Sequence, residues 1–123
     1  MKLILLVFFG GGIGSTLRFI ISKTLNPYFQ HFFLGTFLVN SIGCLLMGFI
    51  IGLSFKGDYL THQQTLLFTT GFCGGFTTFS AFAFEKYELL NNGALLHFTI
   101  YLISSILVGV LAVALGIWLA KIL

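Results

Sequence analysis

Four long apolar stretches, separated by short polar segments, fill almost all of this 123-residue sequence and constrain its fold more than any other feature. A bilayer core about 30 Å thick needs roughly 20 helical residues per crossing, so four crossings use about 80 residues and leave only short connections. The sequence therefore predicts an all-α membrane protein with one transmembrane domain, residues 1–123. Its four expected helices cover residues 3–21, 32–55, 64–84 and 95–121.

Composition excludes several other classes of protein. Residues are 58% hydrophobic and only 7% charged, whereas about a quarter of a soluble domain is charged. The net charge of +3 comes from basic residues that are scattered singly, so the basic patch typical of nucleic-acid binding is absent and no nucleic-acid partner is expected. No nucleophile, base and orienting group converge in the sequence, which disfavours an enzyme.

Basic residues near the ends of the stretches show no preferred orientation. The Lys and Arg bias of short loops normally sets the orientation of a membrane protein. Here three basic residues lie toward one side of the membrane and three toward the other. Without the arginine, which lies inside a stretch, the count is three against two. Two oppositely inserted copies could then pair about a two-fold axis in the membrane plane, which predicts an antiparallel, dual-topology homodimer. The two groups are Lys2, Lys56 and Lys121 on one side, and Arg18, Lys23 and Lys86 on the other.

The third stretch contains two adjacent glycines, Gly74 and Gly75, followed by Thr77 and Thr78. These residues lie about ten positions from either polar end, close to the expected bilayer midplane. Glycine weakens a helix there, so we expect the third helix to be broken near the midplane. The freed carbonyl groups could hold a cation, although the two glycines could instead simply permit close packing.

Aromatic and polar side chains suggest a path for an anion. Phe79 and Phe82 are three residues apart, and the positive edge of a phenyl ring can attract a small anion, although most of the sixteen phenylalanines must contact lipid or neighbouring helices. Asn40 either joins helices or presents an amide donor to a pore. Tyr101 and Ser105 place hydroxyl groups one turn apart. Donors on several helices, with no acidic residue among them, fit an anion better than a cation.

Arg18 is the only arginine and lies near the end of the first stretch. An arginine at such a position either extends to the interface or faces a water-filled cavity. In the second case it would form a vestibule that attracts anions.

Three segments resemble, in order and spacing, the signature stretches of the CrcB or Fluc fluoride channels. They read GGGIGSTLRF (residues 10–19), GTFLVNSIG (35–43) and GFCGGFTTFSAF (71–82). The resemblance covers the whole chain. It implies an antiparallel homodimer whose two pores let fluoride leave the cytoplasm passively across the plasma (inner) membrane of a prokaryote.

The resemblance also implies roles for individual residues. Gly74 and Thr77 would give backbone carbonyls to a structural, non-transported sodium ion, and Arg18 matches the arginine of the first signature. Ala81 stands where the family often has threonine and receives no role. The fluoride pore would be lined by Asn40, Thr78, Phe79, Ser80, Phe82, Tyr101 and Ser105.

A small multidrug-type exporter, which also has four short helices, is a rival interpretation. Proton-coupled transporters of that kind need an ionisable carboxylate inside the membrane. Asp58, Glu85 and Glu88 are all expected at the ends of stretches, which disfavours the exporter. A structural subunit that binds other membrane proteins would leave the polar path without a purpose.

Overall fold

The computed structural model describes all 123 residues, and every regular element in it is helical. Four helical spans are long and apolar enough to cross a membrane, which confirms the expected all-α membrane fold. The first span is α1 (Lys2–Leu25), followed by the short 3-10 helix η1 (Asn26–Tyr28), and the second is α2 (Leu34–Ser54). The third consists of α3 (His62–Leu66), the π-helix η2 (Leu67–Cys73), α4 (Gly74–Phe76) and α5 (Phe79–Asn91), and the fourth is α6 (Leu95–Ile122).

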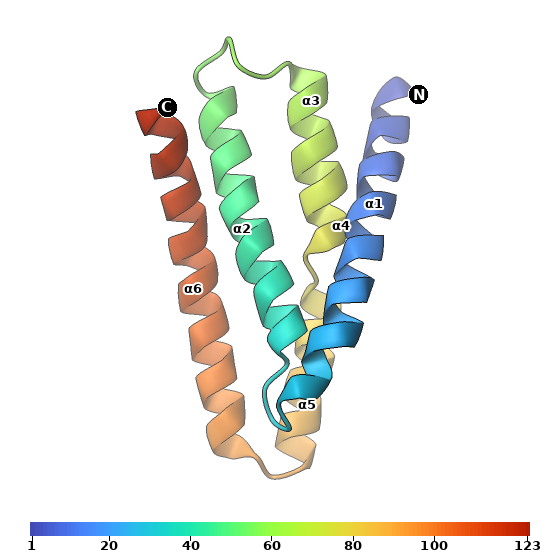
Figure 1. The fold of residues 1–123 in the computed structure, drawn as a ribbon, viewed down its shortest axis with the longest axis vertical. Coiled ribbons are helices and arrows are strands. Elements are labelled where there is room, and N and C mark those ends of the chain that lie inside the picture. Colours follow the sequence, from blue (N-terminus) through green and yellow to red (C-terminus); the bar gives the residue numbers. More distant parts are fainter.

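Both chain termini and the α2–α3 connection lie at one end of the bundle, and the other two connections lie at the opposite end (Figure 1). α2 packs along α6, while α1 packs against η2 and α4. Large apolar side chains are exposed along all four spans, on α1 and α6 above all. Because the bundle has little interior, these side chains are suited to contact lipid rather than water.

Local sequence signals set the helix ends. Pro27 lies in η1, just after α1, and Thr61 begins α3 with a capping box in which it exchanges hydrogen bonds with Gln64. Gly57 and Gly93 have φ angles of 79° and 72°, a backbone conformation that other residues rarely adopt. These two glycines form the turns after α2 and α5.

Small residues allow the helix backbones to approach closely. A Cβ atom on Gly48 would lie 2.2 Å from the Val113 carbonyl oxygen, and one on Gly116 would lie 2.3 Å from the Leu45 carbonyl oxygen. Both contacts join α2 to α6. Comparably close contacts join α1 to the third span, at Gly10, Gly14 and Gly75.

The third span differs from the expected one at its end and in its middle. It continues to Asn91 rather than ending near residue 84. Gly74 and Gly75 are helical in α4, and the residues with extended backbone are Thr77 and Thr78. Hydroxyl and amide groups replace the missing helical hydrogen bonds around these threonines, which explains why they rather than the glycines leave the helix.

Candidate functional site

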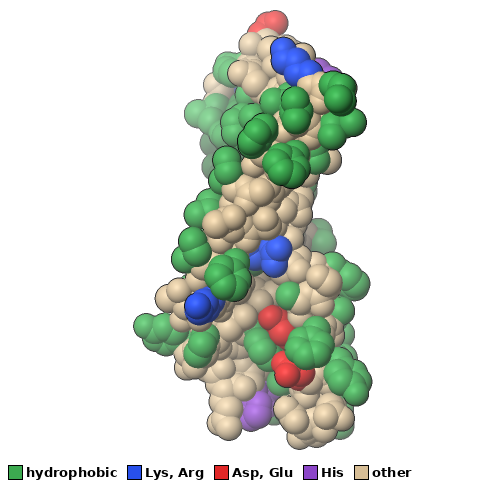
Figure 2. All heavy atoms as spheres, turned by 90° about the vertical axis from the view of Figure 1, so that its right-hand side faces the viewer, with side chains coloured by type: hydrophobic (Ala, Val, Ile, Leu, Met, Phe, Trp, Pro, Cys, Tyr) green, Lys and Arg blue, Asp and Glu red, His purple; other side chains and the backbone are tan.

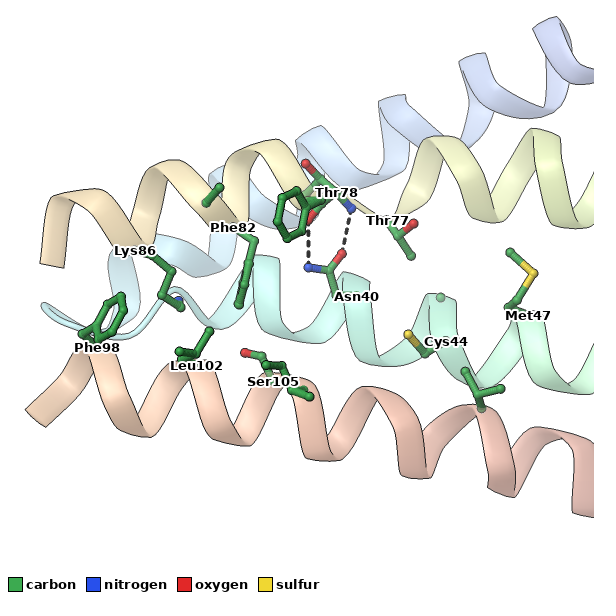
Figure 3. Close-up of a pocket in the computed structure, with 15 residues that line it drawn as sticks. Asn40, Cys44, Met47, Thr77, Thr78, Phe82, Lys86, Phe98, Leu102 and Ser105 are labelled. Carbon is green, nitrogen blue, oxygen red and sulfur yellow. Dashed lines mark hydrogen bonds between the residues drawn. The ribbon is translucent and has the colours of Figure 1, made fainter. Parts of the chain in front are cut away.

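Asn40 of α2 holds the two extended residues between α4 and α5. Its Nδ2 donates to the Thr78 carbonyl oxygen at 3.0 Å, and its Oδ1 accepts from the Thr78 amide at 2.7 Å (Figure 3). One side-chain amide therefore satisfies both backbone groups of Thr78. In an apolar environment an unpaired backbone group costs several kcal/mol, so Asn40 makes this interruption tolerable inside the span.

Two backbone carbonyl groups lose their usual helical donors at this interruption. In a continuous helix the Thr78 amide would donate to Gly74 and the Ala81 amide would donate to Thr77. Instead, the Thr78 amide donates to Asn40, and the Ala81 amide donates to the Thr78 Oγ1 at 3.2 Å. The carbonyl oxygens of Gly74 and Thr77 thus lack their helical donors and are available to another partner.

Arg18 also contacts this region, because its Nε donates to the Gly75 carbonyl oxygen at 3.0 Å. It lines a pocket of about 340 Å³ between α1 and α5, together with Lys23 and Glu85. On the corresponding face of the molecule, basic and acidic side chains lie near one another among hydrophobic ones (Figure 2). Arg18 is therefore tied to the backbone of α4 beside a polar pocket.

A larger pocket of about 620 Å³ lies between α2, α5 and α6. Six of the predicted site residues line it, so the fold brings residues from three helices to one place. These six are Asn40, Thr77, Thr78, Phe79, Phe82 and Ser105.

The remaining predicted residues lie around this pocket or away from it. Ser80 is exposed, with its Oγ 3.4 Å from the Thr78 Oγ1. Tyr101 is fully buried, and its ring lies edge-on to Phe82 with centroids 5.6 Å apart. Gly74 is exposed and Arg18 lies at the smaller pocket.

Phe79 and Phe82 differ sharply in exposure although they are one helical turn apart. Their ring centroids are 6.1 Å apart and the ring planes are tilted by 39°. Phe79 is 79% exposed, whereas Phe82 is partly buried against Tyr101. Phe79 consequently projects from the rim of the pocket, and Phe82 forms part of its wall.

Glu85 is a functional candidate that sequence reasoning missed. In the sequence it only marks the end of a stretch, but in the structure its side chain is only 5% exposed. Its two carboxylate oxygens accept from the Thr36 Oγ1 and, at 2.8 Å, from the Tyr101 hydroxyl. Thr36 in turn accepts from the Asn26 Nδ2 at 3.2 Å, so a buried polar network joins η1, α2, α5 and α6. Glu85 follows Phe82 by three residues, a spacing that could have placed it on the inner face of α5.

Lys86 is likewise buried, with 6% of its surface exposed. Its Nζ lies 2.9 Å from the centroid of the Tyr101 ring and 4.2 Å from that of Phe82. Since Arg18 and Lys86 both contact the interior of the bundle, neither is a loop charge. Without these two residues the count of basic residues would be three (Lys2, Lys56, Lys121) against one (Lys23), so the even balance holds only if both are counted.

We expect the substitution Glu85→Gln to destabilise the fold. In glutamine an NH2 group replaces one of the two carboxylate oxygens, so either Thr36 or Tyr101 loses the acceptor to which its hydroxyl now donates. A buried hydroxyl left without its acceptor costs about 1–3 kcal/mol. The midpoint of thermal unfolding in detergent should fall by about 5 °C or more. Glu88→Gln, the same change three residues away, should leave the midpoint near that of the wild type. Equal midpoints for the two variants would refute a structural role for the network.

Comparison with known proteins places the chain in a family. A family described as "CrcB-like protein, Camphor Resistance (CrcB)" matches residues 5–117. Three similar proteins are each named "Fluoride-specific ion channel FluC". That of Azobacteroides pseudotrichonymphae genomovar. CFP2 is 44% identical over 94% of both chains. That of Phocaeicola vulgatus is 43% identical over 98% of this chain and 100% of its own length, and that of Gloeothece citriformis is 47% identical over 96% of both chains.

Proposed function

Because this chain belongs to the CrcB-like family, we propose that it is a multi-pass fluoride channel of the plasma membrane of a prokaryote and not an enzyme. The observation that carries the proposal is the pocket between α2, α5 and α6. It combines the amide of Asn40 and the hydroxyl of Ser105 with the rings of Phe79 and Phe82. Through this channel fluoride would leave the cytoplasm passively.

The chemistry of the pocket suits a small anion that sheds its water. Asn40 uses one N–H of its amide for the Thr78 carbonyl, so the second N–H is free to donate to fluoride. Ser80 and Ser105 add hydroxyl donors, and the phenylalanine rings can turn their positive edges toward the ion. Several weak sites, one after another along the pore, let the ion both bind and be released, which conduction requires.

The channel is proposed to be an antiparallel, dual-topology homodimer with two pores. Support comes from the pocket itself, because donors such as Asn40 and Thr78 would face lipid in a single subunit, where unpaired polar groups are costly. A second copy would cover them. A reporter fused to the C-terminus tests this topology. Signal on both sides of the membrane is the expected result, and signal on one side alone would contradict dual topology.

A structural sodium ion is proposed at the carbonyl oxygens of Gly74 and Thr77. Both groups lack their helical donors, and carbonyl oxygens freed from interrupted membrane helices are suitable ligands for sodium. The bound cation would supply a fixed positive charge beside the interruption. It would be retained rather than transported.

The experiment that tests the proposed function measures fluoride efflux from loaded proteoliposomes with a fluoride electrode. Efflux should be much faster than from protein-free liposomes, and chloride should not replace fluoride. The substitution Phe79→Ile or Phe82→Ile should reduce efflux while leaving the protein monodisperse. Folded protein that passes no fluoride, but exchanges organic cations for protons, would instead establish the exporter, for which buried Glu85 would be the carboxylate.

A further inference from the structure

We propose that His31 and His97 form a site for a divalent transition-metal ion, such as Zn²⁺, Ni²⁺ or Cu²⁺, at the end of the bundle opposite the chain termini (Figure 1). His31 lies in the connection between η1 and α2, and His97 lies in the first turn of α6. Although the two residues are far apart in sequence, their imidazole rings are in contact, with centroids 4.7 Å apart and ring planes tilted by 43°. The proposal does not depend on the proposed transport of fluoride.

The separation of the two rings is one that a shared metal ion requires. A metal–nitrogen distance of about 2.1 Å and an angle at the metal of about 90–110° place the centroids of two bound imidazoles roughly 4.5–5.3 Å apart. The observed 4.7 Å lies inside this range. Each imidazole can bind through either ring nitrogen, so rotation of a ring can bring a nitrogen toward the ion. The two ring positions therefore already suit two ligands of one ion.

Both rings can be reached from water, and neither is committed to another partner. His97 is exposed and His31 is half-buried. The side-chain hydrogen bonds nearby belong to other residues, such as Asn26 and Thr99, and neither imidazole takes part in one. With 28 residues, α6 is longer than the roughly 20 residues that cross a bilayer core, so its first turn can lie at the interface with water. A dissolved ion thus has access to free ring nitrogens.

The chemistry of the pair selects the class of ion. Neutral imidazole suits Zn²⁺, Cu²⁺ and Ni²⁺, whereas Mg²⁺ and Ca²⁺ prefer oxygen ligands. The chain has no group of three or more His, Cys, Asp or Glu residues that could hold a metal, so water molecules would complete the coordination. The site is therefore distinct from the proposed sodium site, in which backbone carbonyl oxygens are the ligands. Because only two side chains would hold it, the ion would bind reversibly.

A bound ion would join two parts of the fold beside an aromatic contact. Phe32 follows His31 directly, and its ring lies against that of Tyr101 with centroids 5.0 Å apart. Tyr101 is one turn after His97 on α6, and its hydroxyl donates to Glu85 at 2.8 Å. The ion would tie the connection before α2 to the first turn of α6, next to the ring contact that positions Tyr101. It would thereby stabilise the native bundle.

The test measures the midpoint of thermal unfolding in detergent, with any polyhistidine tag removed. Zn²⁺ or Ni²⁺ in large excess over its dissociation constant should raise the wild-type midpoint by about 5 °C or more, whereas Mg²⁺ at the same concentration should not. His31→Ala and His97→Ala should each lose this rise. His62→Ala is the matched control and should keep it, because His62 is an exposed histidine in α3, at the other end of the bundle. No rise in the wild type, or an equal rise in His97→Ala, would overturn the proposal.

A second measurement needs no unfolding and no transport. Pulsed electron paramagnetic resonance of Cu²⁺ bound to the folded wild type should show two coordinated imidazoles, and His62→Ala should give the same spectrum. Fewer than two imidazoles in the wild type, or a spectrum unchanged in His97→Ala, would refute the pair as the site. Two imidazoles in a protein that passes no fluoride would refute the proposed function and keep the metal site, so the two proposals can fail separately.

Discussion

Fluoride efflux should fall roughly 100-fold or more in the variant Asn40→Asp, which corresponds to about 2.7 kcal/mol at 1.36 kcal/mol per factor of ten. Aspartate still accepts from the Thr78 amide, but its second oxygen would face the Thr78 carbonyl oxygen, to which Asn40 now donates at 3.0 Å. A hydrogen bond is thereby replaced by repulsion between two oxygen atoms. The new carboxylate also places a negative charge in a pocket proposed to conduct anions.

Efflux and protein integrity are measured together for this variant. Purified Asn40→Asp should elute as a single symmetrical peak and show slow efflux in proteoliposomes. Asn92→Asp makes the same chemical change at the exposed C-terminal end of α5 and should retain wild-type efflux. Normal efflux in Asn40→Asp would mean that neither the amide donor nor the geometry it supports is needed for permeation.

Gly116→Ala should severely destabilise the bundle. The added Cβ would lie 2.3 Å from the Leu45 carbonyl oxygen and 2.6 Å from the Phe49 amide nitrogen. These are backbone atoms that cannot rotate away, so α2 and α6 would have to separate. Overpacking a well-packed contact costs about 1–3 kcal/mol, and we expect a value at or above the upper end here because the obstacle is backbone.

The matched control for this prediction is Gly109→Ala, seven residues earlier and on the same face of α6. Its Cβ would meet only the Cys44 Sγ, at 3.6 Å, an ordinary van der Waals distance. After a graded heat treatment in detergent, the fraction of protein that remains monodisperse should drop several degrees earlier for Gly116→Ala than for Gly109→Ala. Coincident curves would contradict the close α2–α6 packing.

Several features of the candidate site could be predicted because they depend on local residue chemistry. The extended residues Thr77 and Thr78 follow two adjacent glycines, which marks a weak point in a helix. Asn40 is an amide inside an apolar run, so it requires a hydrogen-bond partner within the protein. Its partner, the backbone of Thr78, was beyond prediction because it lies 38 residues away in sequence.

The burial of Glu85 and Lys86, by contrast, could not be predicted from sequence, because it depends on partners from other helices. Glu85 and Lys86 follow a long apolar run, and a charge at that position usually marks the return to the interface. In the fold, Thr36 and Tyr101 from two other helices satisfy Glu85, and aromatic faces shield Lys86. Such partners lower the free-energy cost of burying these two charged side chains. Because they come from other helices, no sequence pattern within α5 indicates them.

By itself the sequence determined that the chain is a bundle of four membrane-spanning helices, because the length and apolarity of each stretch leave a bilayer as the only suitable surroundings. Only the tertiary structure decided which polar groups are paired and which remain free. Hydrogen bonds and ring contacts between α2, α5 and α6 join residues far apart in the chain, and they satisfy Glu85 while leaving the Lys86 Nζ and the Ser105 Oγ without a hydrogen-bond partner.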